Sequence, residues 1–159
     1  MGEPFVGRRA ELHYLHDRVS RPGMHVLVLG PRGIGKTALV HTYLQQCPRE
    51  HDVATLMGLA PMWSPDALLP LLAQQLGIQS AGLSPAECQH ELLKHVGTKR
   101  SLIALDGLDE APRQRWGDMM RTITDLLRSS TAANVILTSR THPGERSLLR
   151  NCATIALPG

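Results

Sequence analysis

The sequence has few of the features that mark secreted or membrane proteins. Its 159 residues include only three cysteines, widely spaced and without a C-x-x-C pair, which argues against a disulfide scaffold or a zinc ribbon. No apolar run approaches the roughly 18 residues of a membrane span, and residues 1–6 lack the apolar core of a signal peptide. We therefore expect a cytoplasmic protein that has no membrane partner.

Charge of one sign is also scarce. The sequence has 17 Lys and Arg residues against 14 Asp and Glu residues, a formal net charge of +3, and no basic block. Scattered cations permit nucleic-acid binding, but nucleic acid is not indicated as a partner. Repeats and low-complexity linkers are absent, and the length suits one domain of about 150 residues. We expect residues 1–159 to form a single domain.

Apolar runs alternate with helical segments along the chain. The runs predict buried strands at 24–29, 52–59, 101–106, 134–138 and 152–157. Helical patterns predict helices at 12–19, 36–46, 84–97 and 116–127, and one that opens at 64–66. Continuously apolar strands that alternate with amphipathic helices indicate an α/β fold, with a parallel sheet covered on both faces.

Two of the predicted helices carry specific signals. Ser84 and Glu87 form a capping-box pattern at the start of one helix, and Gly97 predicts its end. Pro70 predicts a kink or a late start in the helix that opens at Ser64.

The segment from Gly30 to Thr37 fits the phosphate-binding pattern G-x-x-x-x-G-K-[ST]. Its glycines let backbone N–H groups turn inward around a polyphosphate, and the following helix points the positive end of its dipole at the anion. Lys36 is expected to reach the β and γ phosphates, and Thr37 to offer a hydroxyl to Mg²⁺. The expected nucleotide-binding residues here are Gly30, Pro31, Arg32, Gly33, Ile34, Gly35, Lys36, Thr37 and Ala38.

Three acids follow the predicted strand 101–106. Asp106, at the strand end, is placed to hold Mg²⁺ directly or through water. Asp109 and Glu110 lie one turn further and could orient a water, at the sheet edge where ligands bind in open α/β folds. The alternative is that these acids cap the helix that contains Trp116.

Arg140 follows the predicted strand 134–138, after Thr138 and Ser139. A fixed fork of donors at this sheet edge suits a γ-phosphate. The alternative is an arginine that merely faces solvent after a strand.

Together these segments resemble the nucleotide-binding domain of the signal-transduction NTPases, which include the NACHT and NB-ARC families in the AAA+-like branch of P-loop ATPases. Phe5-Val6-Gly7-Arg8 resembles the family's entry motif, in which the backbone lies near adenine and the arginine helps to hold the nucleotide. Taken alone, this segment is equally compatible with a helix lead-in. The segment from Asp106 to Glu110 is similar to the NACHT form of Walker B, and the segment ending at Arg140 resembles the NB-ARC sensor of the γ-phosphate.

The resemblance implies a three-layer P-loop NTPase fold with strand order 5-1-4-3-2 and with ATP or ADP and Mg²⁺ as cofactors. It implies binding residues Val6, Gly7 and Arg8 besides the loop, metal ligands Thr37 and Asp106, and catalytic residues Asp109, Glu110 and Arg140.

In function, the resemblance implies a signalling switch with slow ATP hydrolysis. Such switches work with effector and sensor domains of a longer chain, and nucleotide can control their oligomerisation. The helical and winged-helix domains of the family have no counterpart in residues 1–159. Gly107 stands where conventional AAA+ ATPases carry a catalytic glutamate, so hydrolysis is expected to use Asp109 or Glu110, or to be slow. The alternatives are an AAA+ turnover ATPase that acts on nucleic acid and a degenerate scaffold that binds nucleotide poorly.

Overall fold

The structure, a computed structural model, describes residues 9–31, 33, 35–46, 51–59, 65–79, 81–110, 113–141 and 152–157. Its strands are β1 (His25–Leu29), β2 (Val53–Gly58), β3 (Ser101–Asp106), β4 (Asn134–Ser139) and β5 (Cys152–Ala156). Its α-helices are α1 (Arg9–Val19), α2 (Lys36–Gln46), α3 (Pro65–Gln75), α4 (Pro85–Thr98) and α5 (Trp116–Ser129). All the predicted helices and strands are present. Two short 3₁₀ helices, Leu108–Glu110 and Arg113–Arg115, are additions that follow β3.

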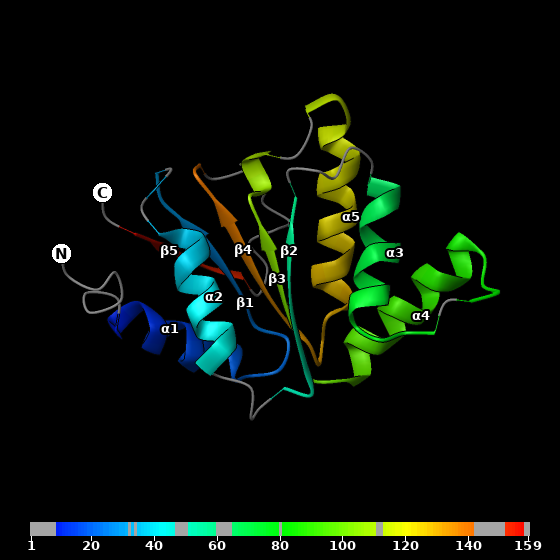
Figure 1. The fold of residues 1–159 in the computed structure, drawn as a ribbon, viewed down its shortest axis with the longest axis horizontal. Helices are drawn as coiled ribbons and strands as arrows, with labels where there is room; N and C mark the ends of the chain where they lie inside the picture. Colours follow the sequence, from blue (N-terminus) through cyan, green and yellow to red (C-terminus); the bar gives the residue numbers. More distant parts are fainter. Residues whose placement is uncertain are drawn as a thin grey trace.

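The five strands form one parallel sheet in the order β2-β3-β4-β1-β5 (Figure 1). This confirms the predicted fold class and the predicted strand order. β4 pairs with β1 on one side and with β3 on the other, and Thr138 of β4 lies beside Val28 of β1. Because parallel strands end at the same edge of a sheet, the end of β4 meets both the loop after β1 and the residues after β3.

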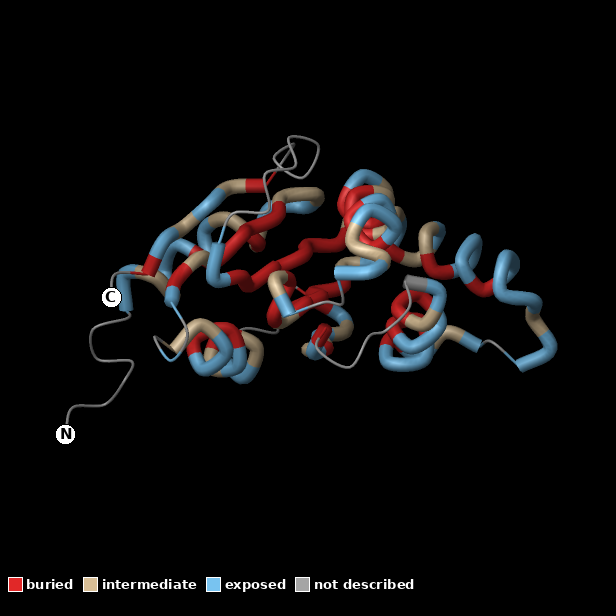
Figure 2. The backbone as a smooth tube through the Cα atoms, turned by 90° about the horizontal axis from the view of Figure 1, so that it is seen from above, coloured by how far each residue is buried: buried red, intermediate tan, exposed pale blue. Residues whose placement is uncertain are grey.

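Helices cover both faces of the sheet and complete the predicted three layers (Figure 2). On one face, Leu15 of α1 and Leu39 of α2 join Val26 and Val28 in a buried cluster. On the other face, α3, α4 and α5 pack over a second cluster, which contains Leu27. Neighbouring residues of β1 therefore point into opposite layers, as the alternation of side chains along a strand requires. Burial on both faces explains why the strands are continuously apolar in sequence.

The local signals of α4 are partly confirmed. Glu87 N–H donates to the Ser84 side chain at 3.1 Å, and Ser84 N–H donates to Glu87 Oε1 at 2.9 Å, so the capping box is present. Gly97 does not end the helix, because the C-cap is Lys99 in an extended conformation. A Cβ at position 97 would lie 3.4 Å from the carbonyl oxygen of Ser129, so the glycine permits close packing against the end of α5.

Pro70 does not delay the start of α3. The helix begins at Pro65 and continues through Pro70 to Gln75, so the expected late start is wrong. Leu68 and Leu72 are fully buried where α3 packs against α4 and α5, and this packing compensates for the backbone hydrogen bond that Pro70 cannot donate. Among the described helices, none is long and apolar enough to cross a lipid bilayer.

His25, the first residue of β1, is buried and ties two other elements together. Its Nδ1 accepts the N–H of Val135 at 3.0 Å, so Nε2 carries the proton and donates to the carbonyl of Leu127 at 3.1 Å. The residue is 1% exposed. Burial, opposed by the Leu127 carbonyl and assisted by the charge of Arg18, lowers the pKa of His25 to about 4. The folded protein therefore needs His25 neutral.

We expect His25 to make folding sensitive to mild acid. Its pKa is about 4 in the folded chain and about 6.5 in the unfolded chain, so the unfolded state takes up the proton first as the pH falls. The stabilisation is complete above pH 6.5 and is lost between pH 6.5 and pH 4, at a cost of about 3 kcal/mol. Urea unfolding at pH 7 and pH 4 measures this loss, and His25→Gln should remove most of it. Equal acid sensitivity of the two proteins would contradict the assignment.

Candidate functional site

The loop between β1 and α2 forms one wall of the site. Gly33 and Gly35 have φ angles of +83° and +96°, which L side chains rarely adopt, so glycine is required at both positions. The N–H of Gly30 donates to the carbonyl of Ser139 at 3.2 Å and attaches the loop to the end of β4. Because α2 begins at Lys36, the first N–H groups of the helix, which lack intrahelical partners, lie directly after the loop.

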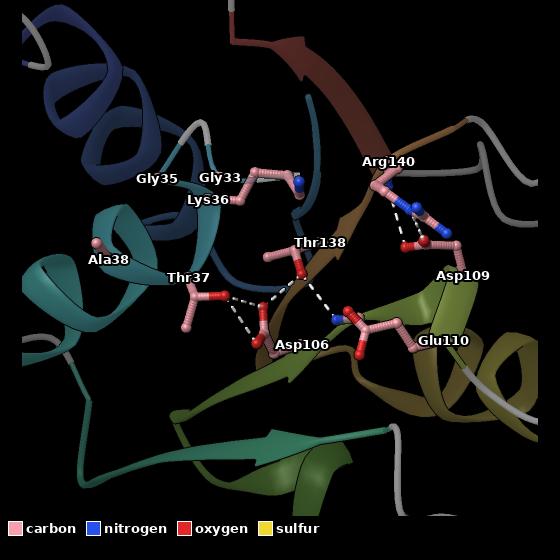
Figure 3. A pocket seen from close by; sticks show the side chains of 11 residues that line it. Gly33, Gly35, Lys36, Thr37, Ala38, Asp106, Asp109, Glu110, Thr138 and Arg140 are labelled. Atoms are coloured by element: carbon pink, nitrogen blue, oxygen red, sulfur yellow. Dashed lines mark hydrogen bonds and ion pairs between the residues drawn. The ribbon is translucent and has the colours of Figure 1, made fainter. Parts of the chain in front are cut away.

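Lys36 holds its side chain over the start of this loop. Its Nζ donates to the carbonyl oxygens of Gly30 at 2.5 Å and Pro31 at 2.9 Å. The ammonium therefore lies within the loop rather than extending into solvent, and it lines the same pocket as Thr37 and Ala38 (Figure 3).

Asp106, the last residue of β3, lies between two hydroxyl groups. The hydroxyl of Thr37 lies 3.0 and 2.9 Å from its two carboxylate oxygens. The hydroxyl of Thr138 donates to Oδ1 at 2.6 Å (Figure 3). The residues expected to bind a metal, Thr37 and Asp106, are thus in contact although they are 69 positions apart in the chain.

Asp109 and Arg140 form a two-point ion pair. The backbone N–H of Arg140 donates to Oδ1 of Asp109 at 3.0 Å, and Nε donates to Oδ2 at 2.6 Å. Burial alone would raise the pKa of Asp109, but the hydrogen bonds and charge of Arg140 outweigh it and hold the pKa below its ordinary value. The Asp109 side chain is 11% exposed and the Arg140 side chain 51%, so the guanidinium remains open to the pocket.

Glu110 approaches the pocket beside Gly107. Gly107 has a φ of +83°, and its carbonyl accepts the N–H of Glu110 at 2.9 Å. A Cβ at position 107 would lie 3.2 Å from Cδ of Glu110. The carboxylate of Glu110 therefore lies next to the space that a side chain at position 107 would enter.

These groups surround a single pocket of about 390 Å³ at the carboxyl edge of the sheet (Figure 3). The lining residues are Gly33, Gly35, Lys36, Thr37, Ala38, Asp106, Gly107, Asp109, Glu110, Thr138 and Arg140. Most of the residues expected at the site are brought together here. Val6, Gly7, Arg8, Arg32 and Ile34 lie outside the described residues.

The sequence left two alternatives open, that the acids after β3 cap a helix and that Arg140 merely faces solvent, and the structure agrees with neither. The N-cap of α5 is Arg115 and has no side-chain cap, so the acids after β3 do not cap the Trp116 helix. Arg140 does not simply face solvent, because it is bound to Asp109. Thr138 also lines the pocket, and the sequence places it at a strand end within the segment that resembles the γ-phosphate sensor, although it is not among the expected site residues.

The sheet order, the glycine-rich loop after β1 and the acid at the end of β3 define a P-loop NTPase. A family model described as AAA domain matches residues 19–144. The chain belongs to this AAA domain family. The narrower resemblance to the NACHT and NB-ARC families stays a prediction.

Solved structures show the same fold. The Aeropyrum pernix ORC1 protein in complex with DNA has a TM-score of 0.70 and 21% identity, and the match covers 95% of this chain and 45% of that chain. Drosophila ORC bound to DNA has a TM-score of 0.65 and 22% identity, with 94% and 42% covered. C. elegans PCH-2 has a TM-score of 0.56 and 12% identity, with 94% and 42% covered. This chain thus spans less than half the length of these proteins. A separate comparison with curated proteins gave no match.

The statement that nucleic acid is not indicated needs correction. The A. pernix ORC1 and Drosophila ORC structures are both complexes with DNA, so the fold is shared with proteins associated with nucleic acid. A low net charge and the absence of a basic block in the sequence do not exclude nucleic-acid binding. Cations scattered along a sequence can gather on one surface when the chain folds.

Proposed function

We propose that this domain binds ATP and ADP with Mg²⁺ in the pocket at the carboxyl edge of the sheet and acts as a nucleotide-dependent switch with slow hydrolysis. The observation that carries the proposal is the convergence of Lys36, Asp106 and Arg140, from three separate strand ends, on one pocket. The ammonium of Lys36 suits the phosphates of a nucleotide, and the carboxylate of Asp106 suits the metal. The guanidinium of Arg140 suits the γ-phosphate. Val6, Gly7 and Arg8, with the loop residues from Gly30 to Ala38, remain the proposed nucleotide contacts.

The donor atoms near Thr37 suit Mg²⁺. The hydroxyl of Thr37 and the carboxylate of Asp106 are hard oxygen donors about one hydrogen bond apart, and Mg²⁺ is bound in proteins by oxygen ligands and phosphates. When bound, the metal would neutralise charge on the phosphates. Lys36 and the N–H groups at the start of α2 would hold the polyphosphate in place.

The two acids after Asp106 would have different roles. Both oxygens of Asp109 already accept hydrogen bonds from Arg140, and its lowered pKa makes it a poor proton acceptor. Glu110 lies beside position 107, where conventional AAA+ ATPases carry their catalytic glutamate. We therefore assign the orientation of the attacking water to Glu110, and the positioning of Arg140 to Asp109.

Arg140 would distinguish ATP from ADP. Asp109 engages the backbone N–H and Nε, which leaves the terminal nitrogens of the guanidinium for a γ-phosphate. Such contacts contribute about 1.5–3 kcal/mol each, whereas shifting a two-state equilibrium from 1:99 to 99:1 needs about 5.5 kcal/mol. A full switch would therefore need contacts beyond this pocket.

Replacing Arg140 tests the switch. Arg140→Ala is expected to weaken ATP binding roughly 10- to 150-fold and to leave ADP binding nearly unchanged, because only ATP offers a γ-phosphate. Calorimetric titration of both nucleotides measures the two affinities. Arg121→Ala removes an arginine whose side chain is 77% exposed on α5 and should change neither affinity. If Arg140→Ala weakens the binding of ATP and ADP equally, Arg140 does not sense the γ-phosphate. If the folded wild-type protein binds neither nucleotide, the domain is a degenerate scaffold.

A second candidate function is an AAA-type ATPase that turns over ATP in association with nucleic acid. The observation that favours it is the structural similarity to the ORC1 and ORC complexes with DNA. Steady-state ATP turnover with and without duplex DNA separates the candidates. A switch should hydrolyse ATP slowly in both conditions, whereas stimulation of turnover by DNA would favour the second function.

A further inference from the structure

A groove lies between α3, α4 and α5, apart from the nucleotide pocket. These three helices pack against one another on the side of the molecule away from α1 and α2 (Figure 1). The groove has a volume of about 430 Å³, within the range of about 300–1,000 Å³ that is usual for ligand sites. None of its described lining residues lines the nucleotide pocket. We call it the helical groove.

The deepest part of the helical groove is apolar. Leu69 of α3 is 9% exposed, and Leu93 of α4 is half-buried. Pro70 and Ala86 add further apolar surface from the same two helices. A ligand with apolar groups would remove this surface from water, which favours binding.

The charge of the helical groove is negative. Asp66 lies in the first turn of α3 and Asp125 on α5, so carboxylates line the groove from two different helices. The chain has 17 Lys and Arg residues against 14 Asp and Glu residues, yet the described lining contains no Lys, Arg or His. The groove therefore attracts a cationic group and repels phosphates and carboxylates.

Asp125 is the carboxylate that we assign to the cation. It is half-buried, and within the described part of the chain it forms no hydrogen bond and no ion pair. Asp66 is already paired with Arg115 at 3.6 Å, and its side chain, 85% exposed, adds negative charge at the rim. Thr122, three positions before Asp125 on the same helix, and Gln89 of α4 also line the groove. They offer further oxygen acceptors for an N–H donor.

A basic side chain of a protein matches these features. The aliphatic stem of an arginine or a lysine packs on apolar surface such as that of Leu69 and Leu93, while its charged end reaches a carboxylate. Leu71, which follows Pro70 on α3, is 39% exposed and is one of two exposed large hydrophobic side chains in the described part of the chain. A protein segment can cover the groove and Leu71 together, whereas a small amine fills only the groove.

We propose that the helical groove binds a segment of a partner protein that presents an arginine or a lysine between apolar residues. The basic side chain pairs with Asp125, and the apolar residues cover Leu69, Leu93 and Leu71. The proposal goes beyond the nucleotide-binding function and uses none of the residues that line the nucleotide pocket.

The test selects binders to the folded wild-type protein from a library of short random peptides displayed on phage. Enriched peptides should carry an arginine or a lysine beside apolar residues. Fluorescence anisotropy then measures the affinity of the most enriched peptide. Asp125→Asn keeps the size of the side chain but removes its charge, and it should weaken this affinity roughly tenfold or more.

A matched variant and a second groove variant accompany Asp125→Asn. Glu91→Gln makes the same change of charge at an exposed position of α4 outside the groove, and it should change the affinity less than about twofold. Ala86→Lys introduces a cation at an exposed position of the groove and should weaken binding as Asp125→Asn does. Matching thermal unfolding curves of the variants and the wild-type protein show that a loss of affinity is not a loss of fold.

Several results would overturn the proposal. They are a failure to enrich any peptide, enrichment of acidic peptides, and binding that Asp125→Asn leaves unchanged. If N-acetylarginine amide competes as strongly as the selected peptide, the groove is a site for a small cation and not for a protein segment. If sedimentation shows that the wild-type protein is a dimer and that Asp125→Asn is a monomer, the groove is occupied by a second copy of this chain.

Discussion

Replacing Lys36 with alanine is expected to weaken ATP binding roughly 30-fold or more, because truncating one partner of a hydrogen-bonded charge pair costs about 2–5 kcal/mol. Lys36 is the first residue of α2, and its ammonium lies over the loop against the carbonyls of Gly30 and Pro31. A chain of four methylenes lets it move from these carbonyls to a phosphate without movement of the backbone. Fluorescence titration with a labelled ATP analogue measures the effect.

A matched variant separates the loss of this contact from a general loss of charge. Lys94→Ala removes an exposed lysine of α4, a helix that contributes no residue to the lining of the pocket. It should bind ATP like the wild-type protein. If Lys36→Ala remains folded and binds ATP with unchanged affinity, the assignment of the loop is wrong.

The fold was accessible from the sequence because its signals are local. α2 occupies residues 36–46 as expected, since the glycines before Lys36 and the proline after Cys47 limit the helix on both sides. The capping box of Ser84 likewise involves residues three positions apart. The strand order is different in kind, because it came from a family resemblance and not from the pattern of residues.

The contacts within the site were much less accessible. Asp109 and Arg140 are 31 positions apart, and Thr138 and Asp106 are 32 apart. Their pairing depends on β3 and β4 being neighbours and on the register between them. The sequence placed these residues at one edge of the sheet. It could not show which acid would form an ion pair with Arg140 and which would remain available to orient a water molecule. Gly97 illustrates the same limit, since its role depends on packing against α5.

Glu110→Gln is expected to lower the rate of ATP hydrolysis about 100-fold or more and to leave ATP affinity nearly unchanged. The substitution keeps the size of the side chain and removes its ability to accept a proton. The expectation follows from the space beside Gly107, where a Cβ would lie 3.2 Å from Cδ of Glu110. Single-turnover hydrolysis of radiolabelled ATP measures the rate even when hydrolysis by the wild-type protein is slow.

Asp109→Asn is the informative comparison, because it neutralises the adjacent acid in the same turn. If Asp109 positions Arg140, this variant should reproduce part of the loss of discrimination between ATP and ADP that is expected for Arg140→Ala. Combining the two substitutions should add little, since residues that act through one contact are not additive. If Asp109→Asn lowers hydrolysis as much as Glu110→Gln while discrimination is intact, the roles of the two acids are reversed. The ion pair with Arg140 would then have to loosen before each hydrolytic step, because the hydrogen bonds and the charge of Arg140 lower the pKa of Asp109 and make it a poor proton acceptor.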